Sequence, residues 1–284
     1  MTIRVGIGGW TYAPWRGLFY PEGLAQAREL EFASRAVTTI EVNGTFYRTQ
    51  TPKTFASWAE QSPDDFVFAL KAPRYATNRR VLAEAGESIA RFVSSGIVEL
   101  GDKLGPINWQ FAGTKLYDPD DFGAFLALLP KTEAGVALRH AVEVRHASFC
   151  TPAFIAQARA AGVAVVVADS KAYPTLADPT ADFIYARLQD AEAHIETGYT
   201  HAALDTWAVR AGQWANGGTA EGLPTYGAAT PKTPKAKTPK PKTPKPKTGT
   251  SGTGKRDCFI YMINGAKERA PAAAQALLAR LQAR

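Results

Sequence analysis

Short runs of apolar and β-branched residues alternate along the chain with longer segments whose apolar positions recur every three to four residues. Several of the short runs are almost continuously apolar, which is typical of parallel strands covered on both faces. The expected strands are Ile3–Gly8, Thr39–Val42, Phe66–Lys71, Pro106–Phe111, Ala141–Val144, Val163–Ala168, Phe183–Ala186 and Cys258–Ile263. The expected helices are Glu22–Ser34, Thr54–Gln61, Glu84–Lys103, Asp120–Leu129, Pro152–Ala160, Ala202–Asn216 and Pro271–Ala283.

This alternation predicts an α/β fold. Eight strands with intervening helices in about 250 residues favour a (β/α)8 TIM-like barrel, formed as one domain over residues 1–284. A doubly wound open sheet remains the alternative, because alternation alone does not show whether a sheet closes. Only the segment SKAYPTLADPTAD, between the sixth and seventh strands, is too short and too marked by proline for more than a turn or two of helix.

The charge of the chain is concentrated in one segment. The chain has 33 Lys and Arg against 26 Asp and Glu, a net charge of +7, and residues 229–256 hold nine of the positive charges and no acid. The rest of the chain therefore carries a small negative charge. Proline at every second or third position among repelling lysines predicts a disordered Lys/Pro/Thr-rich insertion before the last strand. In a barrel, this loop lies at the end opposite the usual active site. Weak contact between its lysines and nucleic acid is one alternative for its role.

The remaining composition excludes several classes of protein. The only cysteines, Cys150 and Cys258, cannot build a disulfide framework or a zinc site. No apolar run has the length of a signal peptide or of a membrane span. We therefore expect a cytoplasmic protein with no membrane contact.

Polar residues collect at the C-terminal ends of the expected strands, where a barrel carries its chemistry. The two-residue period places Glu41 with Asn43 on one strand face, and Glu143 with Arg145 on another. Buried charges are costly unless paired, so these residues indicate either a small-molecule pocket or an ion-pair layer that caps the barrel. The candidate site residues are Trp10, Tyr12, Glu41, Asn43, Tyr47, Lys71, Arg74, Gln110, Glu143, Arg145, His146, Asp169, Arg187 and Asn264.

Several of these residues lie in motifs that resemble those of a known family. The motifs are, in order, GGWTYAPWRGLFYPEGL, VNGTFYR, LKAPRYAT, the isolated Gln110, VEVRHASF, YARL and YMINGAKERAPAAA. They resemble the domain of unknown function 72 family, or YecE-like proteins, over almost the whole chain outside the lysine-proline segment. The resemblance implies a TIM-like barrel with a polar pocket at the strand C-termini and no particular reaction. The positions that match also include Trp15, Phe19, Tyr20, Phe46 and Thr77.

The chain departs from the family pattern at three places. Asn78 stands where the family has histidine, and Gln189-Asp190 replaces a His-Gly pair. Ala112-Gly113 replaces a Pro-Pro pair. The two missing histidines weaken any acid-base mechanism assigned to those positions by analogy.

Three kinds of chemistry remain open at the strand ends. Lys71, Arg74, Arg145 and Arg187 are expected to hold a polar, anionic small molecule. Glu41 and Glu143 are candidate proton-transfer groups, and a desolvated Lys71 is a candidate amine nucleophile. A non-catalytic ligand-binding protein, or a nucleic-acid-associated one, is the alternative to an enzyme.

The cofactor is unknown. A metal site is not expected, because His146 is the only well-placed histidine and the nearby cations compete for the carboxylates. The glycines of VGIGGW do not form a dinucleotide loop, because Thr11 stands where that loop needs glycine.

Overall fold

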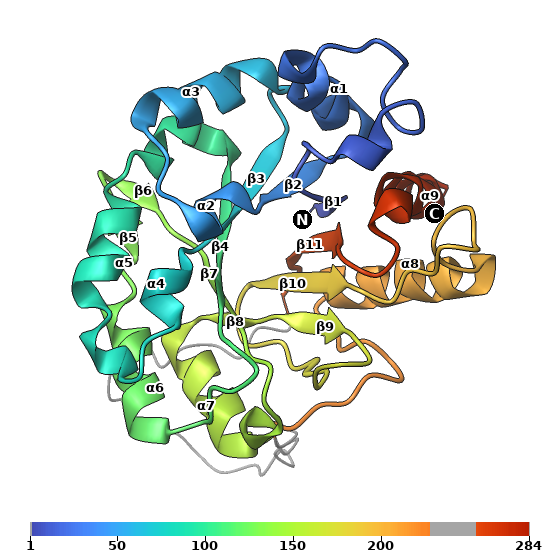
Figure 1. The fold of residues 1–284 in the computed structure, drawn as a ribbon. Coiled ribbons are helices and arrows are strands. Elements are labelled where there is room, and N and C mark those ends of the chain that lie inside the picture. Colours follow the sequence, from blue (N-terminus) through green and yellow to red (C-terminus); the bar gives the residue numbers. More distant parts are fainter. Residues whose placement is uncertain (1, 228–253, 284) are drawn as a thin grey trace, which may run out of the picture.

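The computed structural model describes residues 2–227 and 254–283. Nearly all of the predicted insertion, residues 229–256, lies outside the described residues. Figure 1 shows a ring of strands surrounded by helices. Among the described helices, none is long and apolar enough to cross a membrane.

The strands form a nearly closed parallel barrel. They are β1 (Ile3–Gly8), β2 (Thr39–Val42), β3 (Val67–Lys71), β4 (Leu104–Gln110), β7 (His140–Glu143), β8 (Ala164–Val165), β9 (Val167–Asp169), β10 (Phe183–Leu188) and β11 (Asp257–Met262). A separate antiparallel hairpin pairs β5 (Thr132–Glu133) with β6 (Val136–Ala137).

The ring meets itself through β8 and β9, the two halves of one strand position. β8 pairs with β7, β9 pairs with β10, and the Val166 amide between them donates to the Val142 carbonyl at 3.0 Å. The nine segments therefore occupy eight strand positions. The predicted TIM-like barrel is confirmed, and the open-sheet alternative is wrong.

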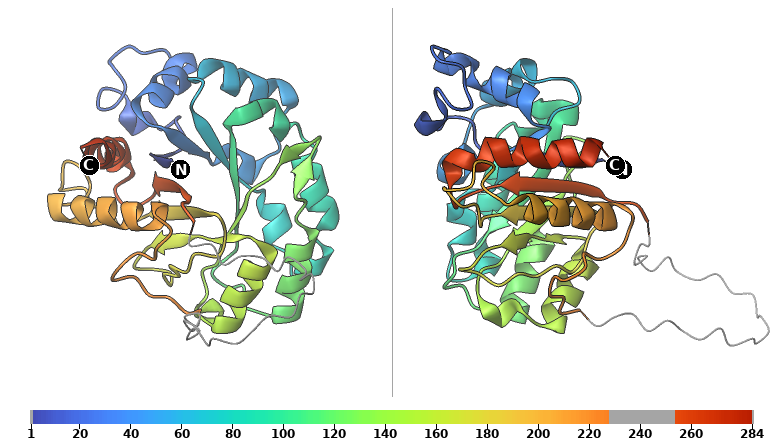
Figure 2. Two further views of the ribbon diagram at one scale, coloured as in Figure 1. Left: turned by 180° about the vertical axis from the view of Figure 1, so that it is seen from behind. Right: turned by 90° about the vertical axis from the view of Figure 1, so that its right-hand side faces the viewer.

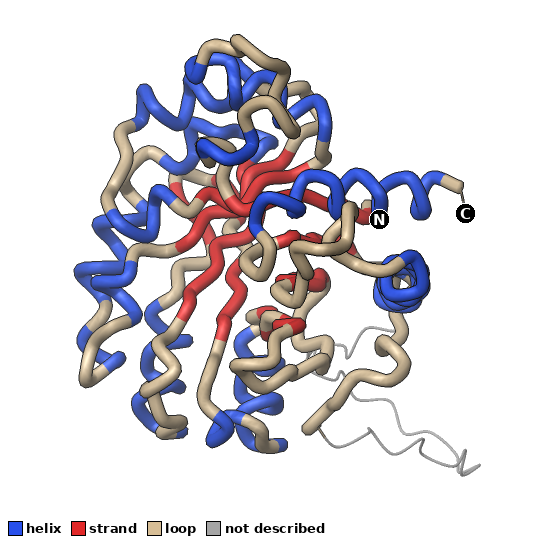
Figure 3. Tube along the Cα trace, turned by 45° about the vertical axis from the view of Figure 1, so that its right-hand side comes forward, coloured by secondary structure: helices blue, strands red, loops and turns tan. Residues whose placement is uncertain are grey.

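Helices cover the outside of this ring, as Figure 3 shows. They are α1 (Glu29–Ala36), α2 (Gly44–Tyr47), α3 (Pro52–Gln61), α4 (Arg74–Thr77), α5 (Gly86–Val93), α6 (Pro119–Leu128), α7 (Pro152–Ala161), α8 (His201–Ala215) and α9 (Ala270–Gln282). Short 3₁₀ helices lie at Ala13–Trp15, Gln26–Arg28, Leu82–Glu84, Ile97–Lys103, Ala147–Phe149 and Lys267–Arg269. Figure 2 shows α8 and α9 beside β11, at the end of the chain.

Local sequence explains where four of these helices begin. The side chains of Thr51, Asp118, Thr151 and Thr200 accept hydrogen bonds from backbone amides in the first turns of α3, α6, α7 and α8. Such caps satisfy amides that have no partner within the helix. In α3, α6 and α7 the cap is followed by a proline, which suits the first helical position.

Two predicted helices differ from the structure. The expected helix Glu84–Lys103 is divided into α5 and the 3₁₀ segment Ile97–Lys103, because Gly96 between them takes a positive φ of 98°. Gly101, with φ of 57°, kinks the 3₁₀ segment itself. These angles lie outside the right-handed helical region. The expected helix at Glu22–Ser34 begins only at Gln26, as a 3₁₀ turn that leads into α1.

The wall of the barrel separates two apolar clusters. Side chains that alternate outward, such as Ile40, Leu70 and Ile184, join the large core between the strands and the helices. Side chains that alternate inward, such as Phe183 and Phe259, form a second cluster inside the ring. This alternation is the two-residue period of a strand applied to a barrel.

Candidate functional site

The C-terminal end of the barrel interior contains a buried ionic layer. Arg187, which ends the inward face of β10, is 2% exposed and lies between two carboxylates that are fully buried. Its Nη2 is 3.0 Å from Glu41 Oε1, and its Nη1 is 2.5 Å from Glu143 Oε2. The Tyr185 hydroxyl, one inward position earlier on β10, donates to Glu41 Oε2 at 2.6 Å. Side chains from β2, β7 and β10 thus meet at the guanidinium group of Arg187.

A second guanidinium completes the layer. Arg145 Nε and Nη2 lie 2.8 and 2.7 Å from Glu143 Oε1. Asn108 Nδ2, from β4, donates to Glu41 Oε2 at 3.4 Å and to Glu143 Oε2 at 3.3 Å. The two carboxylates are therefore balanced by two guanidinium groups, and an amide bridges them.

The electrostatics of this layer keep Glu143 ionised. Burial raises its pKa, but the guanidinium groups of Arg187 and Arg145 outweigh burial and hold the pKa at about 2. Burial lowers the pKa of Arg187, yet Glu143 and Glu41 keep it above its usual range. Glu143 and Arg187 are thus both charged at neutral pH.

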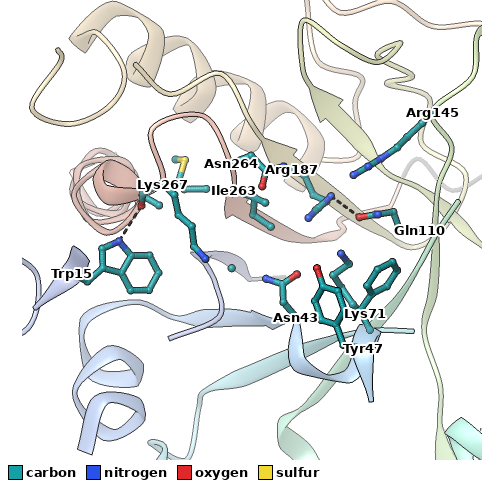
Figure 4. A pocket seen from close by; sticks show the side chains of 14 residues that line it. Trp15, Asn43, Tyr47, Lys71, Gln110, Arg145, Arg187, Ile263, Asn264 and Lys267 are labelled. Carbon is teal, nitrogen blue, oxygen red and sulfur yellow. Dashed lines mark hydrogen bonds between the residues drawn. The ribbon is translucent and has the colours of Figure 1, made fainter. Parts of the chain in front are cut away.

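A cavity of about 340 Å³ opens directly above the layer, at the mouth of the barrel (Figure 4). Its walls come from strand ends and from the loops that follow them. They are formed by Gly8, Trp15, Asn43, Phe46, Tyr47, Lys71, Gln110, Arg145, Arg187, Met262, Ile263, Asn264, Lys267 and Ala270. Four of these side chains are cationic and none is acidic.

Lys71 ends β3 and is only 6% exposed. Its Nζ lies 4.1 Å from the ring centroid of Phe46, and it forms no ion pair with a carboxylate among the described residues. The Thr45 hydroxyl donates to the Lys71 carbonyl at 2.7 Å, which fastens α2 and its Phe46 against β3. Burial is the main reason why the pKa of Lys71 falls to about 8. The Glu41 carboxylate opposes this fall, and the cationic Arg187 adds to it.

Lys267 approaches the cavity from the opposite wall, in the 3₁₀ turn that leads into α9. Its Nζ lies 4.4 Å from the ring centroid of Tyr12, and its carbonyl accepts a hydrogen bond from Trp15 Nε1 at 3.0 Å. Within residues 2–227 and 254–283, it too has no carboxylate partner. Partial burial lowers its pKa.

Three amide side chains also line the cavity. Gln110 Oε1 accepts from Arg187 Nη1 at 3.3 Å, and Asn264 Nδ2 donates to Gln189 Oε1 at 3.1 Å. Asn43, the third, lies near the middle of the cavity in Figure 4. Side-chain amides both donate and accept hydrogen bonds, so these three residues suit hydroxyl or carbonyl groups of a ligand.

The turn after β11 brings Asn264 to the cavity. Asn264 and Gly265 both adopt left-handed backbone conformations, with φ of 63° and 58°. A Cβ on Gly265 would lie 2.6 Å from the Ala191 carbonyl oxygen, so the turn requires glycine there.

The structure thus gathers most of the predicted residues into one site. Those that line the cavity are Asn43, Tyr47, Lys71, Gln110, Arg145, Arg187 and Asn264. Glu41 and Glu143 lie beneath it and are bound to arginine. Arg74 lies close to the rim, with its guanidinium carbon 5.9 Å from the ring centroid of Tyr47.

The remaining four predicted residues also do not line the cavity. Trp10 packs edge-on against Trp58, and Tyr12 lies beneath Lys267. His146 Nδ1 accepts from the backbone amide of residue 148 at 3.1 Å and so caps a 3₁₀ turn. Asp169 ends β9 outside the lining, where burial and the neighbouring Asp190 carboxylate raise its pKa to about 6.

Three residues of the site, Asn108, Tyr185 and Lys267, were not among the predicted candidates. Asn108 and Tyr185 each stand two positions before a predicted residue on the same strand, so the two-residue period was the signal that could have identified them. Lys267 lies in the last family motif, three residues after Asn264.

The described residues do not gather three or more His, Cys, Asp or Glu side chains that could hold a metal ion. Within the ionic layer, every carboxylate oxygen of Glu41 and Glu143 already accepts a hydrogen bond. The donor set at the mouth is therefore cationic and amide in character.

Comparison with known proteins identifies the family. The family model described as "Protein of unknown function DUF72" matches residues 4–239. The UPF0759 protein YecE of Escherichia coli, in strains K12 and O157:H7, is 27% identical over 150 residues, which are 52% of this chain and 50% of the relative. The chain thus spans about half the length of the curated relatives it matches.

Solved structures show the same fold. A DUF72 family protein of Thermotoga maritima superposes with a TM-score of 0.71 at 19% identity, covering 99% of this chain and 100% of the other. One from Enterococcus faecalis gives 0.64 at 15% identity, covering 99% and 96%. The family match over most of the chain and this shared barrel agree, and the chain belongs to the DUF72 family of proteins of unknown function.

Proposed function

We propose that the cavity binds a small, anionic, polar molecule and that the protein is an enzyme acting on it. The observation that carries this proposal is the imbalance of charge at the mouth. Glu41 and Glu143 are neutralised by Arg187 and Arg145, which leaves the positive charge of Lys71, like that of Lys267 opposite, without a carboxylate partner in the described chain.

The size of the cavity and its lining agree with such a ligand. About 340 Å³ falls at the small end of the range for small-molecule sites. A carboxylate or phosphate placed among lysine and arginine side chains gains charge-assisted hydrogen bonds, which are stronger in a partly desolvated site than in water. The amides of Asn43, Gln110 and Asn264 would contact the uncharged part of the ligand.

Lys71, rather than the predicted Glu41 or Glu143, is the better proton-transfer group in this cavity. An effective general base needs a pKa near the working pH, and Glu143, with a pKa of about 2, is poorly matched to that task. Lys71, with a pKa of about 8, is well matched and lines the cavity. Glu41 and Glu143 then serve as positioning residues for Arg187 and Arg145.

Binding of inorganic phosphate, measured by isothermal titration calorimetry in a phosphate-free buffer, tests the anion site. We expect Lys267→Ala to weaken binding about tenfold, the loss of one charge-assisted hydrogen bond worth about 1.5 kcal/mol. Lys131→Ala is the matched control, because Lys131 is exposed at the opposite end of the barrel. Equal affinities in the wild type and in both variants would contradict the proposal.

A non-catalytic ligand-binding protein would share this site, so turnover rather than affinity separates it from an enzyme. Weak contact between residues 229–256 and nucleic acid stays a prediction from the sequence, since nearly all of that segment lies outside the described residues.

A further inference from the structure

We infer that Lys71 is an amine nucleophile that condenses with the carbonyl group of its substrate, so that the ligand of this cavity is a small anionic carbonyl compound such as a 2-oxo acid. This inference rests on the proposed function, because it needs an anion-binding cavity. It adds a covalent step and a substrate class.

The environment of Lys71 distinguishes it from the other cations of the cavity. Arg145 and Arg187 are held by carboxylates, whereas Lys71 is 94% buried and contacts an aromatic ring instead. Lys267 also lacks a carboxylate partner in the described chain, but it is less buried. A buried ammonium without an anionic partner is unfavourable, and an amine in that position is more easily deprotonated.

The amino group is also accessible to a ligand. Lys71 lines the cavity, and Figure 4 shows its Nζ among the side chains of Asn43, Tyr47 and Gln110. Because burial lowers its pKa to about 8, roughly a tenth of the Lys71 side chains are unprotonated at pH 7, against less than about 0.1% for an ordinary lysine. A buried lysine near other cations is a recognised form of activated amine.

The acid group of such a substrate would lie among the cations of the same cavity, beside Arg145 and Arg187 and within the field of the two lysines that lack a carboxylate partner in the described chain. Arg145 and Arg187 line the wall next to Gln110, and a carboxylate there would place an adjacent carbonyl carbon close to the amine. The guanidinium groups also withdraw electron density from the bound acid, which favours attack at the carbonyl carbon.

The chemistry balances without a further reagent. The neutral amine adds to the carbonyl carbon and a C–N bond forms. The electron pair of the broken C–O π bond moves to the carbonyl oxygen, which takes up the proton that the nitrogen releases. The resulting carbinolamine loses water as the C=N bond forms. Amine and carbonyl thus give imine and one water, with no change in oxidation state.

Reductive trapping tests the step. The full-length protein is incubated with pyruvate, treated with sodium borohydride, digested and examined by mass spectrometry for carboxyethyl groups on lysine. We expect modification of Lys71 to saturate with pyruvate and to exceed that of Lys267, in the same cavity, at least tenfold. Lys71→Arg should lose the saturable adduct, and Lys131→Arg should retain it. Equal labelling of Lys71, Lys267 and surface lysines would overturn the inference.

A second measurement does not depend on the choice of carbonyl compound. Competitive labelling with acetic anhydride over a range of pH gives the pKa of individual lysines, and we expect Lys71 to titrate near pH 8, below the ordinary value of 10.5. A Lys71 pKa above 10 would overturn the inference.

Phosphate binding separates the two proposals. If phosphate binds and Lys71 forms no adduct, the anion site stands and the imine does not. If phosphate does not bind and Lys71 forms no adduct, both are wrong. Protection of Lys71 from trapping by phosphate would support both.

Discussion

The two ends of the barrel interior are built from the same strands but hold opposite kinds of side chain. On β10, three successive inward positions are Phe183, Tyr185 and Arg187, which change from apolar to ionic along the strand. β3 shows the same order with Val67, Ala69 and Lys71. The N-terminal end of the barrel interior is therefore filled by apolar side chains, which stabilise the fold. The C-terminal end holds charged side chains, which are not required to form a hydrophobic core.

Each end of the barrel interior holds an arginine, and the two arginines differ in burial and in their partners. Arg139, at the N-terminal end, lies 4.9 Å from the ring centroid of Phe259 and 3.3 Å from Asp257, in a partly exposed pair. Arg187 instead pairs with two carboxylates that are completely buried. Buried ion pairs rarely stabilise a fold relative to apolar packing. The ionic layer is thus more readily explained by the site above it than by the stability of the barrel.

The largest expected effect comes from breaking the buried layer. Arg187→Ala leaves Glu41 and Glu143 without their shared guanidinium, and we expect a loss of about 3–5 kcal/mol in the free energy of unfolding. Arg139→Ala, at the other end, should cost about 1 kcal/mol or less. Urea denaturation at pH 7 measures both. Similar losses in the free energy of unfolding for the two variants would show that the two ends of the barrel interior do not differ in this way.

Lys71 should give an effect of opposite sign. Its folded-state pKa of about 8 lies below its ordinary value of 10.5, so its burial as a cation costs stability. This cost is fully present below pH 8 and disappears as the pH rises toward 10.5. We expect Lys71→Met to be more stable than the wild type by up to ~3 kcal/mol at pH 7, with the difference closing above pH 8.

Urea denaturation of Lys71→Met and the wild type at several pH values measures this difference. A residue kept for function at the expense of stability behaves in this way. A variant less stable than the wild type at pH 7 would show that Lys71 contributes to the fold, as the apolar end does.

The smallest expected effect lies beside the site, at Asp169. Burial and Asp190 raise its pKa to about 6 from 3.8, so the folded state binds a proton more tightly than the unfolded state. The resulting stabilisation is complete below pH 3.8 and is lost as the pH rises through 6. Above pH 6, Asp169→Asn should be more stable than the wild type by ~1 kcal/mol, allowing for solvent screening.

Thermal unfolding of Asp169→Asn between pH 4 and 7 checks the prediction. If the melting temperatures of the wild type and of Asp169→Asn changed in parallel over this pH range, Asp169 would be solvated like an ordinary surface carboxylate. Asp169 would then be unrelated to the buried layer.

Much of the fold was predictable from the sequence because its signals are local. Runs such as Ile3–Gly8 and Thr39–Val42 carry their strand preference within a few residues, and both strands have the predicted bounds. The helix breaks at Gly96 and Gly101 were not predicted, since glycine within an apolar periodic segment is tolerated in many helices.

The sequence by itself determined which residues stand at the C-terminal ends of the strands, because strand periodicity fixes the side of the wall that each faces. Only the tertiary structure decided how they pair. Glu41 and Arg187 are separated by 146 positions and meet across the closed ring, and His146 turns away to cap a neighbouring turn. Lys71 forms no ion pair with a carboxylate in the described chain for the same reason, since Glu41 and Glu143 are held by arginine. Ion pairing between side chains on distant strands depends on how the barrel closes and on which neighbouring groups compete for each carboxylate. Neither can be predicted from a local sequence pattern.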